Sequence, residues 1–252
     1  MTAAAQPQAM PLGRAIAAYF SEARYESLRL LRTPAFSIPI LAMPVLMYLF
    51  FGVLLGGRGG PGTANWLFVG WTVFAVMGPG LFGFGVLVAV ERTQGILVLK
   101  RALPMPPGVY LSAKLIMALA FAAMVMVLLI AVGLLVGHVS LPPLTLLTVA
   151  GVMSLGVIPA CAVGLFIGAY APASSAAAIA NIVYLAMAFL SGLFFPLPAA
   201  LQVFRPIWPT YHLAQLALAS GGLPSHGSLL GHVAILAVIS VVLTTLAARR
   251  LA

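Results

Sequence analysis

The chain has 252 residues, of which 63% are hydrophobic and only 6% are charged, and its mean hydropathy is +1.17. Soluble domains carry roughly 25% charged residues, so this composition excludes a water-soluble globular fold. The formal net charge is +9, but the basic residues are scattered between apolar runs and form no continuous face or recognition motif, which argues against nucleic-acid binding.

Six apolar runs are long enough to cross a bilayer. A hydrocarbon core about 30 Å thick needs roughly 20 helical residues, and a single segment satisfies its own backbone hydrogen bonds in lipid only as a helix. The alternation typical of lipid-facing barrel strands is missing. The expected spans are residues 36–55, 66–90, 111–136, 144–170, 174–195 and 229–248.

Residues 1–34 are predicted to form a cytoplasmic segment, and residues 35–252 a single transmembrane domain. In the first segment apolar residues from Leu12 to Leu31 recur at roughly helical spacing. This pattern predicts an amphipathic helix lying on the membrane, with a solvated leader helix as the alternative. Thr33-Pro34 should end the helix, because proline disfavours helical geometry at the residue before it.

The stretch 196–222 contains two apolar pieces that are too short to span and are separated by prolines. We expect a pair of short re-entrant or interfacial helices on the outer face, between the fifth and sixth spans. Under this plan only Arg58 and Arg205 of the twelve basic residues lie outside. Because Lys and Arg are retained on the cytoplasmic side, both termini are predicted to be cytoplasmic.

The residues that the chain lacks restrict its chemistry. It has no aspartate, and its three acids, Glu22, Glu26 and Glu91, avoid the middle of the spans, which disfavours an ion-driven carrier. No catalytic triad, metal-ligand spacing or phosphate loop is present, and the single Cys161 excludes an intrachain disulfide. The four histidines fall near the expected outer side, as polar end groups. We expect no enzyme activity, cofactor or metal in this chain.

The connector after the second span, residues 91–111, reads ERTQGILVLKRALPMPPGVYL. It resembles the cytoplasmic coupling segment of ABC-2 type exporter permeases, in the branch that exports drugs, antibiotics and lipids. Residues 29–34, leading into Pro39 and Pro44, resemble the entry to the first helix of that family. Residues 191–196 through 208–212 resemble its outer re-entrant segment. Val98 departs from the pattern, because many relatives carry a polar residue there.

The resemblance implies a bacterial inner-membrane exporter whose ATP and magnesium sit on a separate ATPase. Two ATPase copies and a second permease, identical or related, are the implied partners, together with membrane lipids and a hydrophobic or amphipathic substrate. Apolar residues of the connector would dock on the ATPase while its charges orient it, although the charges also suit a purely topological role. The coupling candidates are Glu91, Arg92, Gly95, Leu97, Leu99, Lys100, Arg101 and Pro104.

On the fifth span, five residues are predicted to share a face. The resemblance implies that the first and fifth helices meet across a dimer, so this face would pack there or line the substrate route. The candidates are Ala178, Asn181, Leu185, Ala188 and Gly192. Two other function classes remain open at this point: a stand-alone channel or carrier, and a membrane-assembly or immunity protein that transports nothing.

Overall fold

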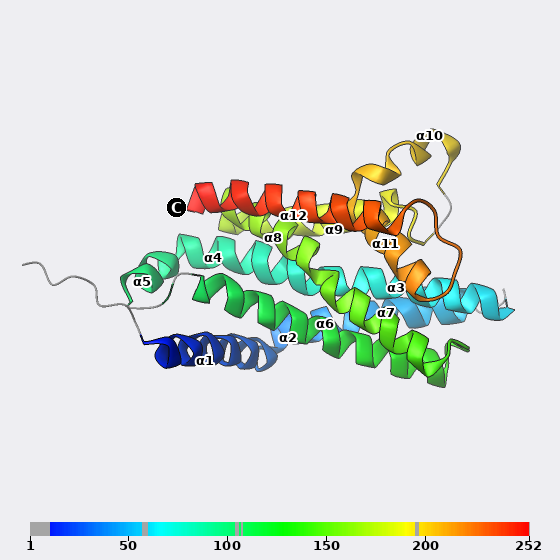
Figure 1. Ribbon diagram of the computed structural model, residues 1–252, viewed down its shortest axis with the longest axis horizontal. Coiled ribbons are helices and arrows are strands. Elements are labelled where there is room, and N and C mark those ends of the chain that lie inside the picture. Colours follow the sequence, from blue (N-terminus) through cyan, green and yellow to red (C-terminus); the bar gives the residue numbers. More distant parts are fainter. Residues whose placement is uncertain (1–10, 57–59, 104–105, 107, 195–196, 252) are drawn as a thin grey trace, which may run out of the picture.

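The computed structural model describes residues 11–56, 60–103, 106, 108–194 and 197–251. Every regular element within those ranges is a helix (Figure 1). Six helical rods among them are long and apolar enough to cross a membrane, which confirms the predicted all-α membrane fold. The rods are Pro34–Leu55, Gly62–Thr93, Val109–Leu135, Pro143–Tyr170, Ala173–Leu190 and Leu229–Leu251.

Three of the rods are built from more than one segment. The first joins α2 (Pro34–Met47) to the π-helix η1 (Tyr48–Leu55), the second joins α3 (Gly60–Gly80), the π-helix η3 (Leu81–Val86) and α4 (Leu87–Thr93), and the fourth joins α7 (Pro143–Leu155) to α8 (Val157–Tyr170). The other rods are the single helices α6 (Val109–Leu135), α9 (Ala173–Leu190) and α12 (Leu229–Leu251).

The irregular segments follow prolines. Pro44 lies inside α2 just before η1, and Pro79 lies inside α3 just before η3. Proline has no backbone N–H and its ring clashes with the preceding turn, so the hydrogen-bond ladder is interrupted there and a π-turn accommodates the mismatch. The rods remain continuous through these points.

Helix α3 forms the centre of the bundle. In the second rod, 78% of the most apolar window is buried inside the chain, against 11% for α12, so the chain itself surrounds α3 and leaves α12 for lipid. Glycines bring the second rod and α8 together, because a Cβ on Gly164 would lie 2.5 Å from the Gly80 carbonyl oxygen. Close backbone approach at small residues is how membrane helices gain packing energy.

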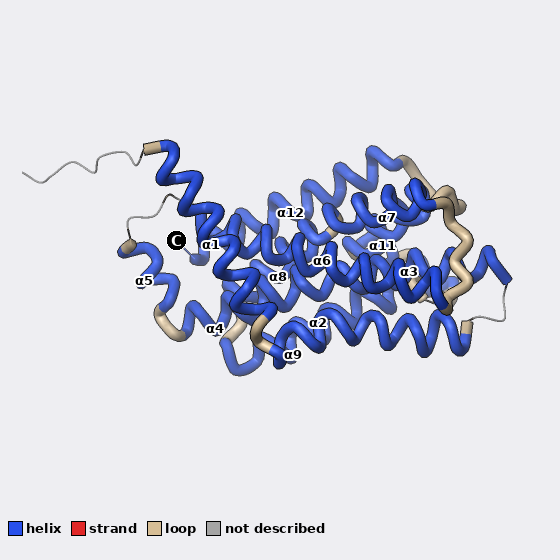
Figure 2. Tube along the Cα trace, turned by 90° about the horizontal axis from the view of Figure 1, so that it is seen from below, coloured by secondary structure: helices blue, strands red, loops and turns tan. Residues whose placement is uncertain are grey.

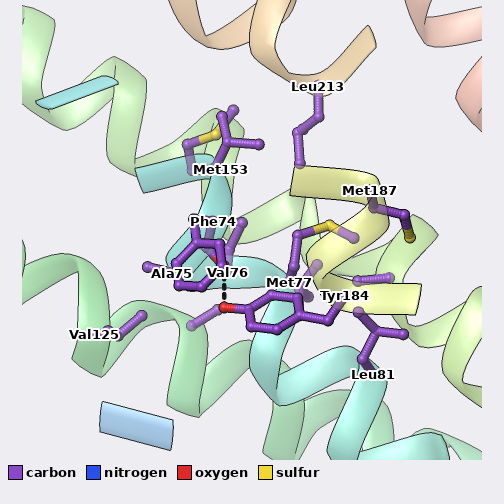
Figure 3. Close-up of a cluster of buried hydrophobic side chains, with 14 of the residues drawn as sticks. Phe74, Ala75, Val76, Met77, Leu81, Val125, Met153, Tyr184, Met187 and Leu213 are labelled. Carbon is purple, nitrogen blue, oxygen red and sulfur yellow. Dashed lines mark hydrogen bonds between the residues drawn. The ribbon is translucent and has the colours of Figure 1, made fainter. Parts of the chain in front are cut away.

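Figure 3 shows the centre of the core, where side chains from α3, α7, α9 and the short helix α11 (Pro209–Ser220) meet. The Tyr184 hydroxyl donates a hydrogen bond to the Phe74 carbonyl oxygen at 2.9 Å. Met77, Met153 and Met187 fill the space around it and are almost fully buried. This contact joins the fifth rod to the second at mid-height.

The short helices occupy the two ends of the bundle. Helix α1 (Leu12–Leu31) packs on α6 and lies at one end with α5 (Ile96–Ala102) and the C-terminus, whereas α10 (Ala199–Gln202) and α11 (Pro209–Ser220) lie toward the other end (Figure 1). Figure 2 shows α1 inclined to the long axis of the bundle. Leu12, Ile16 and Phe20 are exposed on α1 while Ala23 and Leu30 are buried, as in an amphipathic helix.

Helix α11 does not cross the bundle. Its 12 residues extend about 18 Å, which is well short of a hydrocarbon core of about 30 Å. It packs on α3, α7 and α12, and the 3-10 turn η4 (Arg205–Ile207) precedes it. The predicted short helices between the fifth and sixth rods are therefore confirmed.

Candidate functional site

Helix α5 is a short arm that leaves the bundle after α4. The backbone reverses at Gly95, whose φ of +74° lies in the left-handed region that glycine enters without a steric penalty. Beyond this turn Val98 and Leu99 are 70% and 63% exposed, and Leu103 is 47% exposed. An apolar helix face at the end of the bundle, on an element with charged neighbours, is typical of a surface that binds another protein.

Beneath this arm lies a buried group of charges, here called the charge cluster: Glu26 and Arg29 of α1, Glu91 of α4, and Tyr110 and Lys114 of α6. The Lys114 side chain is 1% exposed, and those of Glu26 and Glu91 are 4% and 6% exposed. Lys114 Nζ lies 2.7 Å from Glu26 Oε1 and 3.1 Å from Glu91 Oε2. One ammonium group therefore holds carboxylates from two different helices.

Arg29 and Tyr110 complete the cluster. Arg29 Nη2 lies 2.9 Å from both Glu26 Oε1 and Glu91 Oε1, and the Tyr110 hydroxyl donates to Glu91 Oε2 at 2.6 Å. Burial by itself lowers the pKa of Arg29, but the attraction of the two carboxylates outweighs it and the pKa is raised. Two negative and two positive charges balance, so the cluster is neutral while it stays intact.

Two further contacts attach the arm and its connector to the bundle. Lys100 of α5 forms an ion pair with Glu22 of α1 and lies 5.0 Å from the centroid of the Tyr110 ring, which allows a cation–π interaction. Arg92 donates to the carbonyl oxygens of Ala169 and Ala171, the latter at 2.7 Å. These carbonyls end α8, where a helix has unpaired acceptors and a partial negative charge that favours a cation.

A comparison with protein families identifies the family of this chain. The family model described as ABC-2 type transporter matches residues 18–220, a range that holds most of α1 and all of the charge cluster, the arm and α11. The chain belongs to the ABC-2 type transporter family. It is also 28% identical over 213 residues to "Putative transport permease YvfS" of Bacillus subtilis (strain 168), a match that covers 81% of this chain and 86% of that protein.

As an ABC-2 permease, the chain is a multi-pass membrane protein and a transporter subunit, and its family works with a partner ATPase. The structure places the predicted coupling residues in two groups. Leu99 points outward, together with Val98, while Leu97 is half-buried. Glu91 and Arg92 bind other helices of this permease and do not face outward, so any orienting effect on a partner would be indirect.

Two of the predicted coupling residues, and one arginine that was predicted to lie outside, are partly or wholly outside the residues that the structure describes. Pro104 and Arg58 are outside the described residues, and so is the side chain of Arg101. Gly95 forms the left-handed turn before the arm. Lys100 is half-buried and bound to Glu22, so it holds the arm to α1.

The fifth-span candidates do not all lie on one face of the permease. Ala178, Asn181 and Leu185 are exposed, but Ala188 is 1% exposed because it packs inside the core of its own chain. Gly192 follows the end of α9 with a φ of +72°, where a Cβ would lie 3.2 Å from Arg205 Nε. The expected shared face is therefore limited to the first three residues.

Sequence reasoning missed the roles of Glu26, Tyr110 and Lys114. The sequence prediction counted Lys114 only among the ten basic residues of the cytoplasmic side, although it lies inside the expected span 111–136. An ionisable residue inside a span is a signal of a buried partner. That signal pointed to Lys114, but the partner on α1 is 88 residues away.

Two histidines form a second polar contact, toward the end of the bundle where α11 lies. His212 Nδ1 and His232 Nδ1 are 2.8 Å apart, and their Nε2 atoms lie 2.8 Å and 2.7 Å from the carbonyl oxygens of Pro206 and His226. Two neutral imidazoles carry two N–H protons in total, which is one fewer than these three contacts can use. Burial, and to a smaller extent His232, lower the pKa of His212, which opposes a third proton. Among the described residues, no group of three metal-binding side chains occurs.

Proposed function

We propose that this permease is the membrane-spanning half of an ATP-driven exporter and that the partner ATPase docks on α5. The single observation that carries the proposal is the exposed apolar face of Val98, Leu99 and Leu103 on an arm fixed to the bundle. A short apolar helix that enters a groove is a recurring mode of protein recognition. ATP and magnesium would then be held by the partner.

The ion pairs beneath the arm would transmit a movement of α5 to the membrane-spanning helices. Lys100 joins α5 to α1, and Glu91 joins the end of α4 to α1 and α6 through Lys114. Because breaking one partner of a buried ion pair is costly, a push on α5 would move α1, α4 and α6 together instead of bending the arm alone. Nucleotide binding would bias two arrangements of the spans by its differential affinity for them.

A second permease copy is supported by Asn181, near the middle of α9. Its side chain is exposed, and no described residue forms a hydrogen bond with it. A polar amide facing lipid is unfavourable, and an interhelical hydrogen bond is worth roughly 0.6–2 kcal/mol in membranes. We propose that a second copy covers this face, beside Ala178 and Leu185, with two ATPases per dimer. The spans carry almost no charge, which suits a hydrophobic or amphipathic cargo.

The test is whether the arm holds and drives the ATPase. The partner ATPase would be co-expressed with the permease, and both its co-purification and the permease-dependent part of its ATP hydrolysis would be measured. Leu99→Asp should reduce both by about tenfold, as expected for loss of roughly 1.4 kcal/mol of docking energy. Gln94→Asp is the matched control, because it adds the same charge at an exposed position of the same connector.

Both variants should insert and fold like the wild type, because neither side chain is buried. Equal co-purification and equal ATP hydrolysis for Leu99→Asp, Gln94→Asp and the wild type would refute docking on α5. Loss of both activities in Gln94→Asp as well would show that added charge, and not the apolar face, is responsible, which contradicts the proposed contact.

A further inference from the structure

A cavity of about 360 Å³ lies between α3, the end of α9 and α11, on the far side of the molecule from the charge cluster. It is called here the α11 cavity. Trp66, Val69, Leu193 and Leu218 supply apolar wall, while Arg205 and Gln215 supply polar groups. Ligand sites in proteins commonly measure about 300–1,000 Å³ and combine apolar walls with a few polar groups.

Arg205 is held in place at this cavity. Its Nε donates to the Ser191 carbonyl oxygen at 3.3 Å, and its guanidinium carbon lies 5.0 Å from the centroid of the Tyr211 ring. Gly192 allows this position, because its φ of +72° suits glycine and a Cβ there would lie 3.2 Å from Arg205 Nε. The guanidinium is therefore oriented before any ligand arrives.

The charge of Arg205 is not neutralised within the chain. The chain has only three carboxylate side chains, and all three bind Arg29, Lys100 or Lys114 at the opposite end. Among the described residues, no acceptor contacts either terminal nitrogen of Arg205. A guanidinium offers two parallel N–H donors that match a carboxylate or a phosphate, so an anionic group is the partner that this site lacks.

We propose that the α11 cavity binds a single-chain amphiphile with one carboxylate or phosphate group. The anionic group pairs with Arg205, and the first part of the apolar chain lies against Val69, Leu218 and the Trp66 ring. A cavity of this size takes one head group and a short apolar segment and has no room for two acyl chains. The site does not depend on ATP-driven export, so its test needs neither the ATPase nor a transported cargo.

The experiment uses the purified full chain in a neutral detergent. Binding of 12-bromododecanoate is followed by quenching of tryptophan fluorescence, with 12-bromododecanol as the uncharged match. The acid should bind about tenfold more tightly than the alcohol, which corresponds to roughly 1.4 kcal/mol for the charge-assisted pair. Dodecyl phosphate should compete with the acid, and dodecyl trimethylammonium should not.

Two variants locate the site. Arg205→Gln should abolish the preference for the acid and leave binding of the alcohol unchanged, whereas Arg249→Gln, an exposed arginine near the C-terminal end of α12, should keep the preference. Ala214→Phe, which fills the cavity from α11, should weaken both ligands. An acid preference that survives in Arg205→Gln, or equal quenching by acid and alcohol in the wild type, would overturn the proposal.

A measurement in lipid bilayers identifies the source of the anion. The titration is repeated in nanodiscs of phosphatidylcholine alone and of phosphatidylcholine with phosphatidylglycerol. Unchanged affinity for the acid supports a free amphiphile as the natural ligand. Competition by phosphatidylglycerol that Arg205→Gln abolishes shows a lipid head group in the site and overturns the single-chain assignment.

Discussion

The most informative perturbation of the fold is Lys114→Met, which removes the central cation of the charge cluster and keeps a side chain of similar length. The cluster contains Glu26 and Glu91 as anions and Arg29 and Lys114 as cations, so its net charge changes from zero to −1. Both carboxylates are nearly inaccessible to water. Leaving a buried charge unpaired costs about 3–5 kcal/mol.

This cost can be measured as a shift in thermal unfolding of the purified chain in one detergent. For a chain of this size a loss of 1 kcal/mol corresponds to roughly 2–4 °C, so Lys114→Met should lower the unfolding midpoint by about 6–20 °C. Lys100→Met is the matched control. Its side chain is 23% exposed and forms one ion pair, which is worth about 0–1 kcal/mol.

The double variant Lys114→Met/Glu91→Gln separates charge balance from packing. It returns the net charge of the cluster to zero, and the single side-chain oxygen of the glutamine can still accept a hydrogen bond from Arg29, while its NH2 group can donate to the Tyr110 hydroxyl oxygen. We expect it to recover at least half of the lost stability. Equal small losses in Lys114→Met and Lys100→Met, or a double variant that is less stable than Lys114→Met alone, would refute the reasoning.

Three further outcomes are expected. Arg92→Gln should cost about 1.5–3 kcal/mol, the value of one hydrogen bond to a charged group, because the shorter glutamine amide can keep at most one of the two contacts with the end of α8. It should also speed hydrogen exchange in the last turn of α8, and unchanged exchange would contradict the capping role. Burial lowers the pKa of His212 below the value of about 6.5 that it has when unfolded, so its contribution to stability is present above that pH and is lost as the pH falls. The unfolding midpoint should therefore drop more between pH 8 and pH 5 in the wild type than in His212→Gln, and equal drops would refute this. With Cys161 replaced, an impermeant thiol reagent applied outside should label a cysteine at Ser225 but not at Ser175, and the reverse result would invert the predicted orientation.

The six spans were predictable because the signal is local. Twenty apolar residues in succession force a helix in lipid, and the prolines mark where it stops. Where the ends differ, the second rod is the clearest case, because it continues to Thr93, past Glu91 and Arg92 and beyond the expected end at residue 90. Hydropathy ends the span at the first charges, but these two charges are paired inside the protein and the helix does not stop there.

The charge cluster was not predictable in the same way, because its partners are distant in the sequence. Glu26 and Lys114 are 88 residues apart, and a single sequence carries no information on which acid meets which base. The same limit applies to His212 and His232, which were interpreted as separate polar end groups. A helical wheel likewise places Ala188 beside Leu185, and only the packing of α9 on its neighbours shows that Ala188 is buried.

On the proposed function, this permease transports its cargo only when an ATPase acts on it. The direct measurement is transport of a fluorescent hydrophobic dye in liposomes that contain the purified permease with or without the partner ATPase. The dye should move only when both proteins and hydrolysable ATP are present, and about tenfold less with Leu99→Asp in the arm. Movement of the dye by the permease alone, at the rate seen with the ATPase and ATP, would contradict the proposed function.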